Sequence, residues 1–212
     1  STAEAVRLAR HAATVGASAV LVVSPYYNKP TQAGLYAHFA AVAEAVDVPV
    51  IVYDIPGRSI VRVNDNTMAK LASDFVNISG IKDATADLAR PTNLQNMLGS
   101  AFTQLSGEDA TVLPYLAAGG HGCISVTANI APKLLSDMHA AWWAGDIATA
   151  QAINKQLLPV HEAMFCEASP GPVKYAASLL DICAFETRLP LCEIANSNKI
   201  LVKNALLNAG LL

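Results

Sequence analysis

Short aliphatic and β-branched runs alternate with longer helical stretches as far as Val126. Five such runs predict strands, over residues 19–24, 49–54, 78–82, 102–106 and 122–126. Helical patterns of about 10 to 15 residues separate them. Continuous apolar strands joined by helices are typical of parallel βαβ units, in which helices cover the sheet. The chain is therefore predicted to be an α/β protein.

Two architectures fit this pattern: an open doubly wound sheet and part of a (β/α)8 barrel. A doubly wound nucleotide-binding sheet carries a glycine-rich turn between a strand and the helix that follows it. The glycine cluster of this chain, "GGHG" at Gly119–Gly122, precedes a predicted strand instead. We therefore favour the barrel.

From Ala131 onward the pattern is helical, with breaks at Gly145, at Ser169–Pro172 and at Pro190. We predict a partial (β/α) barrel over residues 1–145 and a C-terminal helical region over residues 146–212. A complete barrel needs eight strands and about 250 residues. The expected fold is thus a (β/α)8 TIM barrel that lacks its first three strands, followed by a C-terminal helical extension.

Composition excludes several classes of protein. Charged residues make up 15% of the chain, the net charge is −3 and basic residues are scattered, so a nucleic-acid partner is not expected. No apolar run is long enough to span a membrane. The five histidines show no ligand spacing, so we expect no metal. The four cysteines form no C-x-x-C pair and are predicted to be buried or semi-buried thiols in a reducing compartment, which favours the cytoplasm.

Reactive side chains stand where the predicted strands end, which is where barrel enzymes build their active sites. Tyr53 lies near the end of the second strand and Lys82 at the end of the third, so both face the same mouth. A neutral lysine can attack a ketone to form a Schiff base, and an apolar mouth favours the neutral form. A neighbouring tyrosine can relay protons, and Arg58 is suited to binding a carboxylate.

Each of these residues also has a purely structural interpretation. Lys82 can be a solvent-facing strand end, Tyr53 a packing residue and Arg58 a surface residue after a Pro-Gly turn. Their occurrence together at adjacent strand ends suggests a Schiff-base enzyme. It does not name the substrate.

Longer segments carry a resemblance to a known family. They are residues 24–59 ("SPYYNKPTQAGLYAHFAAVAEAVDVPVIVYDIPGRS"), 80–90 ("GIKDATADLAR"), 105–110 ("LSGEDA") and 119–132 ("GGHGCISVTANIAP"). These closely resemble the 4-hydroxy-tetrahydrodipicolinate synthase (dihydrodipicolinate synthase) family of the pyruvate-dependent lyase/aldolase barrels. The resemblance runs along the whole chain.

The resemblance implies an enzyme of diaminopimelate and lysine biosynthesis. Pyruvate, held as a Schiff base on Lys82, would condense with L-aspartate semialdehyde to 4-hydroxy-tetrahydrodipicolinate, without a cofactor. Tyr53 resembles the proton-relay tyrosine. Tyr27 resembles a residue donated across a dimer interface into the neighbouring site. The resemblance also implies a homotetramer built as a dimer of dimers.

Further positions match substrate and effector sites of the family. Arg58 resembles the residue that receives the carboxylate of aspartate semialdehyde. Gly107 and Ile124 resemble positions that line the pyruvate pocket, Ile124 through its backbone carbonyl. Tyr26 and Glu4 fall where lysine-inhibited members bind their inhibitor.

The sequence departs from the family in two ways. Asp54 stands where the family more often has Asn, a change that we interpret as tolerable. The N-terminal part of the family pattern is absent, including a Thr-Thr-Gly-Glu stretch whose threonines help to bind pyruvate and complete the tyrosine relay. The intact later strands favour a partial copy of a longer protein over a truncated barrel.

Two alternatives stay open. One is an N-acetylneuraminate or 2-keto-3-deoxy-sugar-acid lyase of the same superfamily, although these usually lack an arginine at the position of Arg58. The other is a truncated, non-catalytic barrel fragment that serves only in assembly.

Overall fold

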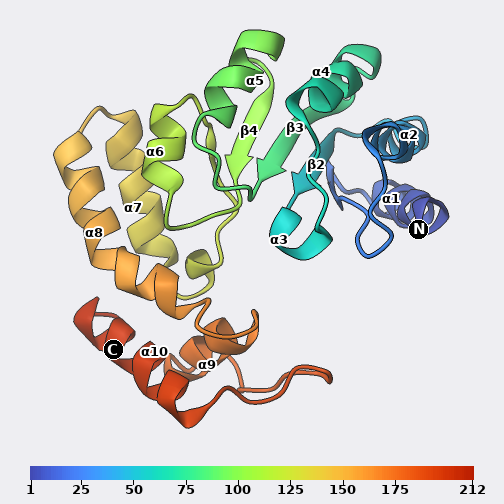
Figure 1. Ribbon diagram of the computed structural model, residues 1–212. Helices are drawn as coiled ribbons and strands as arrows, with labels where there is room; N and C mark the ends of the chain where they lie inside the picture. Colours follow the sequence, from blue (N-terminus) through green and yellow to red (C-terminus); the bar gives the residue numbers. More distant parts are fainter. The chain divides into compact units, whose positions relative to one another are not determined.

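A computed structural model describes residues 1–212 (Figure 1). The chain divides into two compact units, Ser1–Ile124 and Ser125–Leu212. The boundary predicted after residue 145 falls between two helices of the second unit, Pro132–Trp143 and Ile147–Ala163. None of the helices combines the length and the apolar character needed to cross a membrane.

The first unit contains one parallel sheet of five strands. The strands are β1 (Val20–Val23), β2 (Val50–Asp54), β3 (Ile78–Asp83), β4 (Thr103–Ser106) and β5 (Gly122–Cys123). They follow one another in the sheet in sequence order. A doubly wound sheet reverses its strand order at a switch point. This sheet has no reversal, so it is wound in one direction, and the predicted parallel α/β fold is confirmed.

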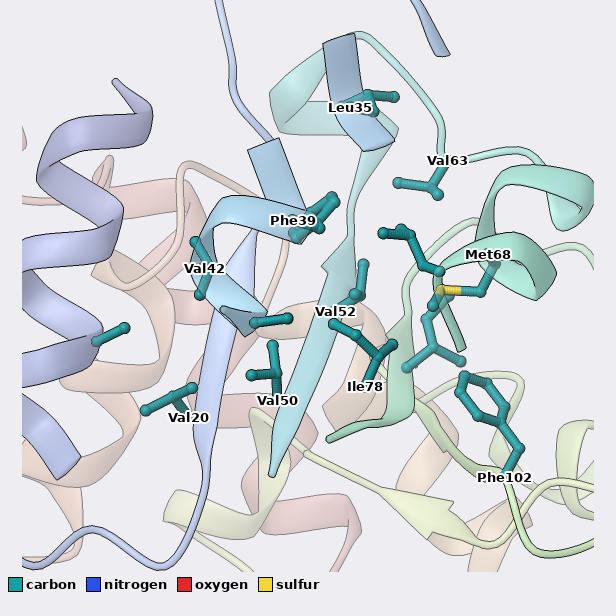
Figure 2. Close-up of a cluster of buried hydrophobic side chains, with 14 of the residues drawn as sticks. Val20, Leu35, Phe39, Val42, Val50, Val52, Val63, Met68, Ile78 and Phe102 are labelled. Carbon is teal, nitrogen blue, oxygen red and sulfur yellow. The ribbon is translucent and has the colours of Figure 1, made fainter. Parts of the chain in front are cut away.

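One helix precedes β1, and the others lie between successive strands. They are α1 (Thr2–Thr14), α2 (Gln32–Ala43), α3 (Pro56–Ser59), α4 (Asp65–Asp74), α5 (Arg90–Leu98) and α6 (Val112–Ala117). Helices α1, α2, α4 and α5 share a single buried apolar cluster with β1, β2 and β3. Figure 2 shows Phe39 and Val42 of α2 close to Val50 and Val52 of β2. A fully buried side chain such as Phe39 contributes about 1.5–3 kcal/mol.

Strand alternation gives the sheet two different faces. Val50, Val52 and Asp54 are buried on the helix-covered face, while Ile51 and Tyr53 are only partly buried on the other. We call this second face the open face. Successive side chains of a strand point to opposite sides, so the sequence of β2 fixes which residues reach each face.

A register shift in β3 sets the pairing at the strand ends. Val50 pairs with Ile78 but Ile51 pairs with Gly80, so Ser79 is one residue more than β2 supplies. A Cβ on Gly80 would lie 2.5 Å from the carbonyl oxygen of Thr103, so only glycine fits at this point.

Two elements differ from the sequence prediction. Strand β5 was expected over residues 122–126 but ends at Cys123, and a 3₁₀ helix, η1 (Thr127–Asn129), follows. The Ser125 hydroxyl accepts a hydrogen bond from the Ala128 N–H at 2.8 Å, which turns the chain out of the strand direction. The Pro-Gly turn predicted before Arg58 is part of the short helix α3, which begins at Pro56. Proline suits a first helical position because its φ is already close to the helical value.

The second unit is helical, as predicted for most of its length. It contains η1, α7 (Pro132–Trp143), α8 (Ile147–Ala163), α9 (Gly171–Leu179) and α10 (Asn196–Asn208). Residues of α8, α9 and α10 form its buried cluster, among them Val160, Met164, Val173, Val202 and Leu206. Helices α7 and α8 are joined at Gly145, whose φ of +78° favours glycine.

Three side-chain predictions need correction. His161, for which the sequence favours a surface or interface position beside Glu162, is buried, and its Nδ1 lies 2.8 Å from the Thr127 hydroxyl. The face of α8 that carries His161 packs toward η1 rather than toward solvent. Cys183 and Cys192, expected to be at least partly buried, are exposed. Both lie in the irregular segment between α9 and α10, where no helix face forces a thiol inward.

Candidate active site

Lys82 and Tyr53 face each other across two neighbouring strands. They are direct partners in the register of β2 and β3. The Lys82 Nζ lies 4.2 Å from the centre of the Tyr53 ring. Both side chains are half-buried on the open face of the sheet. The sequence prediction that these two strand-end residues lie together is thus met by the geometry.

Burial lowers the pKa of Lys82 below its ordinary value, because the ammonium loses hydration. The carboxylate of the nearby Asp109 acts in the opposite direction, as does the face of the Tyr53 ring, which attracts a cation. Loss of hydration is the largest effect. The neutral amine that a Schiff base requires is therefore favoured at this position.

Burial likewise raises the pKa of the Tyr53 phenol, so the hydroxyl keeps its proton at neutral pH. The positive charge of Arg58 lowers that pKa and the carboxylate of Glu108 raises it, both to a smaller extent. Arg58 lies in α3, directly after β2, and is exposed. The phenol is therefore a hydrogen-bond donor with a cation nearby.

The loops after β4 and β5 begin at fixed positions beside Lys82. The Gly107 N–H donates to the Asp83 carbonyl at 2.7 Å, and the Ile124 N–H donates to the Ser106 carbonyl at 2.9 Å. These bonds continue the parallel ladder one residue beyond each strand. Both predicted pocket residues thus stand at the same edge of the sheet as Lys82.

Gly107 packs directly against the lysine side chain. A Cβ at this position would lie 3.1 Å from Lys82 Cε and 2.9 Å from Ala84 Cβ. Contacts this short force a neighbour to move. The absence of a side chain at Gly107 therefore leaves room for the extended lysine.

Tyr27 and Tyr26 lie in the loop after β1 and point into solvent. Tyr27 is 89% exposed and has a φ of +69°, which is uncommon for a residue other than glycine. Tyr26 is 68% exposed. Glu4, in α1, pairs with Arg7 at 2.8 Å. Neither Tyr27 nor Tyr26 packs into the half-buried pair of Lys82 and Tyr53.

Cys123 and Asp109, neither of which the sequence pattern indicates as a site residue, complete the surroundings of Lys82. The Cys123 Sγ lies 3.9 Å from the Asp109 Oδ1. Burial raises the pKa of Cys123 to about 12, so it remains a neutral thiol at neutral pH. No group of three or more His, Cys, Asp or Glu side chains is placed to hold a metal ion.

A buried ionic cluster lies directly behind the reactive pair. Arg90, fully buried at the start of α5, places its Nη1 2.6 Å from Asp54 and 3.4 Å from Asp83. The sequence interpretation of Asp54 is a tolerable change next to no catalytic contact. Strand alternation could have indicated its buried partner, because a carboxylate that follows Tyr53 must enter the helix-covered face, where it needs one.

The chain is similar to known proteins along its whole length. The sequence model of the dihydrodipicolinate synthetase family matches residues 1–209. The 4-hydroxy-tetrahydrodipicolinate synthase of Gluconacetobacter diazotrophicus is 57% identical over 213 residues, which cover 100% of this chain and 71% of the relative.

Solved structures agree with the sequence comparison. The dihydrodipicolinate synthase of Aquifex aeolicus superimposes with a TM-score of 0.97 at 42% identity, over 100% of this chain and 72% of that one. The chloride-inhibited enzyme of Acinetobacter baumannii, solved in complex with pyruvate, gives a TM-score of 0.95 at 43% identity, again over 100% and 72%.

Proposed function

Because the chain belongs to the dihydrodipicolinate synthetase family, we propose that it condenses pyruvate with L-aspartate semialdehyde to form 4-hydroxy-tetrahydrodipicolinate. This is the reaction that precedes diaminopimelate and lysine in biosynthesis. The observation that carries the proposal is the half-buried Lys82 amine, 4.2 Å from the centre of the Tyr53 ring at adjacent strand ends. A relative of the same family has been solved with pyruvate bound.

The first stage is covalent capture of pyruvate. The lone pair of Lys82 Nζ attacks the keto carbon, and the carbinolamine that forms loses water to give an iminium. Tyr53 donates the proton that the departing hydroxyl requires and takes up a proton in return. The iminium then acidifies the methyl group of pyruvate, and loss of a methyl proton gives an enamine.

The second stage makes the carbon–carbon bond. The enamine carbon attacks the aldehyde carbon of the semialdehyde, and the aldehyde oxygen gains a proton to become a hydroxyl. The amino group of the semialdehyde then attacks the iminium carbon and displaces Lys82, which closes the ring and frees the enzyme. One water is released in total, so atoms balance without a redox step.

Three further residues take substrate-binding roles in this proposal. Arg58 binds the carboxylate of the semialdehyde, for which its planar guanidinium is suited. Gly107 and Ile124 line the pyruvate pocket, and their loops start beside Lys82. An inhibitory lysine site at Tyr26 and Glu4 stays a prediction.

We extend the proposal to architecture and assembly. The one-directional sheet suits strands four to eight of a (β/α)8 barrel, and the high TM-scores against family members support this correspondence. A homotetramer in which Tyr27 enters the neighbouring site is supported by the 89% exposure of Tyr27 and by its unusual backbone conformation. A cytoplasmic location stays a prediction.

Trapping with borohydride tests the covalent step. The full-length protein is incubated with pyruvate, reduced and digested, and the peptides are weighed. We expect one reduced pyruvate adduct, located on Lys82, and no adduct in the Lys82→Ala variant. A folded protein that gains no adduct would instead favour the non-catalytic fragment.

Substrate choice separates the proposal from a sugar-acid lyase. We expect turnover with aspartate semialdehyde and none with N-acetylmannosamine. Arg58→Ala should raise the KM for the semialdehyde more than the KM for pyruvate, because the guanidinium contacts only the second substrate. Unchanged kinetics in that variant would refute the role given to Arg58.

A further inference from the structure

Arg90 sits at the centre of an ionic group that has no access to solvent. Its Nη1 lies 2.6 Å from Asp54 Oδ2 and 3.4 Å from Asp83 Oδ1, and none of the three side chains is more than marginally exposed. We call Arg90, Asp54 and Asp83 the Arg90 clamp. It joins the ends of β2 and β3 from the helix-covered face.

The clamp holds the residues next to the reactive pair. Asp54 directly follows Tyr53, and Asp83 directly follows Lys82. The two aspartates are partners in the strand register, as are the two reactive residues. A shift of either aspartate therefore moves the neighbouring Cα on the open face.

Arg90 is itself fixed by two further contacts. Its Nε donates to Asp65 Oδ1 at 3.0 Å, and its Nη2 donates to the Val63 carbonyl at 2.5 Å. Asp83 is held in addition by the hydroxyl of Thr85 at 2.7 Å. These bonds fix the orientation of the guanidinium plane. The ammonium group of a lysine could not make the same set of bonds.

Stability alone does not account for such a group. A buried ion pair often stabilises a protein no more than well-packed apolar side chains of the same volume. What an ionic clamp supplies instead is a defined geometry. That geometry is needed here, because a misplacement of about 1 Å can lower a rate about 100-fold.

We propose that Arg90 is a positioning residue for the Schiff-base reaction. By holding Asp54 and Asp83 together, it keeps the Lys82 amine facing the Tyr53 ring. This inference rests on the proposed function of Lys82.

Loosening the clamp should also change the titration of Lys82. Besides each other, the titratable or charged groups near Lys82 or Tyr53 are Arg58, Glu108, Asp109 and Cys123. The clamp lies on the opposite face, so it acts on Lys82 through the strand positions. If the strand ends separate, water reaches the amine and the ammonium form becomes more favourable.

The test uses Arg90→Lys in the full-length protein, which keeps the charge and loses the planar fork. The concentration of functional active sites is first measured by borohydride trapping of pyruvate. The rate is then divided by this concentration, so that misfolded protein does not lower the value of kcat. We expect kcat per trapped site to fall about 10- to 100-fold, with a KM for pyruvate that changes far less. We expect the acid limb of the kcat/KM profile to move to higher pH.

Arg62→Lys is the matched control. Arg62 pairs with Asp87 at 2.9 Å and lies 3.8 Å from Asp65, at the edge of the same acidic group, but it contacts neither strand end. It should leave the rate per site and the pH profile unchanged. Asp83→Asn is a second test variant, which removes one charge at constant shape and should shift the profile in the same direction as Arg90→Lys.

The outcomes separate this inference from the proposed function. If the wild-type protein traps no pyruvate, the proposed function fails, and the inference with it. If the wild type traps pyruvate and either clamp variant only lowers the amount of folded protein, with normal kcat and pH profile per site, the clamp is structural and the inference fails. If Arg90→Lys does not fold, Asp83→Asn decides on the same criteria.

Discussion

At the scale of single residues, β2 and β3 each end in two consecutive side chains that point to opposite faces of the sheet and have different roles. Tyr53 and Lys82 face the open side, where a substrate can reach them, while Asp54 and Asp83 face the helices. Burial has a different effect on each side. It favours a neutral amine at Lys82, and on the helix side it raises the pKa of Asp54, against which the charge of Arg90 acts.

Gly107→Ala should impair catalysis through Lys82. The added methyl group would meet Lys82 Cε at 3.1 Å and Ala84 Cβ at 2.9 Å, so the lysine must move. We expect kcat to fall by about 10-fold or more. Steady-state kinetics and pyruvate trapping measure the effect. Gly57→Ala is the matched control, because no atom lies within 4 Å of the position its Cβ would take; equal activity of the two variants would contradict the packing argument.

Tyr53→Phe should separate the two contributions of this residue. The variant keeps the ring and the burial of Lys82, so the apparent pKa for pyruvate trapping should stay below the ordinary lysine value of about 10.4. Below that apparent pKa the amine is protonated and trapping slows; above it the rate levels off. Loss of the hydroxyl should lower kcat by about 100-fold or more, because the proton relay is gone.

Trapping with cyanoborohydride across pH, followed by intact mass, measures the Tyr53→Phe variant. Tyr36→Phe serves as control, since Tyr36 lies in α2 and bonds Asp74. A trapping pKa that returns to the ordinary lysine value in Tyr53→Phe alone would show that the hydroxyl, rather than burial, keeps the amine neutral.

At the scale of elements, helices α4 and α5 are tied to the sheet by charge as well as by apolar packing. Asp65 of α4 and Arg90 of α5 belong to the same hydrogen-bonded group as the ends of β2 and β3. Two helices and two strands therefore depend on one guanidinium for their common alignment.

Asp54→Ala should destabilise the first unit strongly. It removes the carboxylate 2.6 Å from a fully buried Arg90 and leaves that charge short of a partner, which costs about 3–5 kcal/mol. Urea unfolding followed by circular dichroism measures the change. Asp74→Ala, which removes a carboxylate from an exposed pair with Lys70, should have a much smaller effect; similar losses would mean that the buried cluster adds little.

The order and type of the strands and helices followed from the sequence because strand and helix periods are local properties. The pairing of Tyr53 with Lys82 followed as well, since adjacent parallel strands end at one edge. The buried ion pairs of Arg90 could not be predicted from the sequence. Its partners Asp54 and Asp83 lie 36 and 7 residues away, and only the fold brings them together. Cys123 beside Asp109, and the early end of β5, depend in the same way on contacts that the local pattern does not contain.

At the scale of the whole molecule, the proposed function places Tyr27 in the active site of a second subunit. This tyrosine lies in the loop after β1, exposed and with a left-handed backbone. In an interface with twofold symmetry, each copy would receive the tyrosine of the other. The active site of a single chain would then lack the tyrosine that the second subunit supplies to the proton relay.

Mixing two inactive variants tests this dependence. Full-length Tyr27→Ala and Lys82→Ala proteins are combined under conditions that exchange subunits. In a mixed dimer one site joins an intact Lys82 with an intact Tyr27, so random exchange should restore about a quarter of the wild-type activity. Sedimentation velocity measures the assembly in parallel. No recovery despite proven exchange would place Tyr27 outside the neighbouring site.

The extra residue at Ser79 has a consequence for how this active site can change. Because Ser79 is surplus to the pairing, β3 can lose one residue at this point and still place Lys82 opposite Tyr53. A regular strand lacks this reserve, since a slip of one residue turns every following side chain to the other face. The position of the amine on the open face therefore tolerates a one-codon deletion at Ser79.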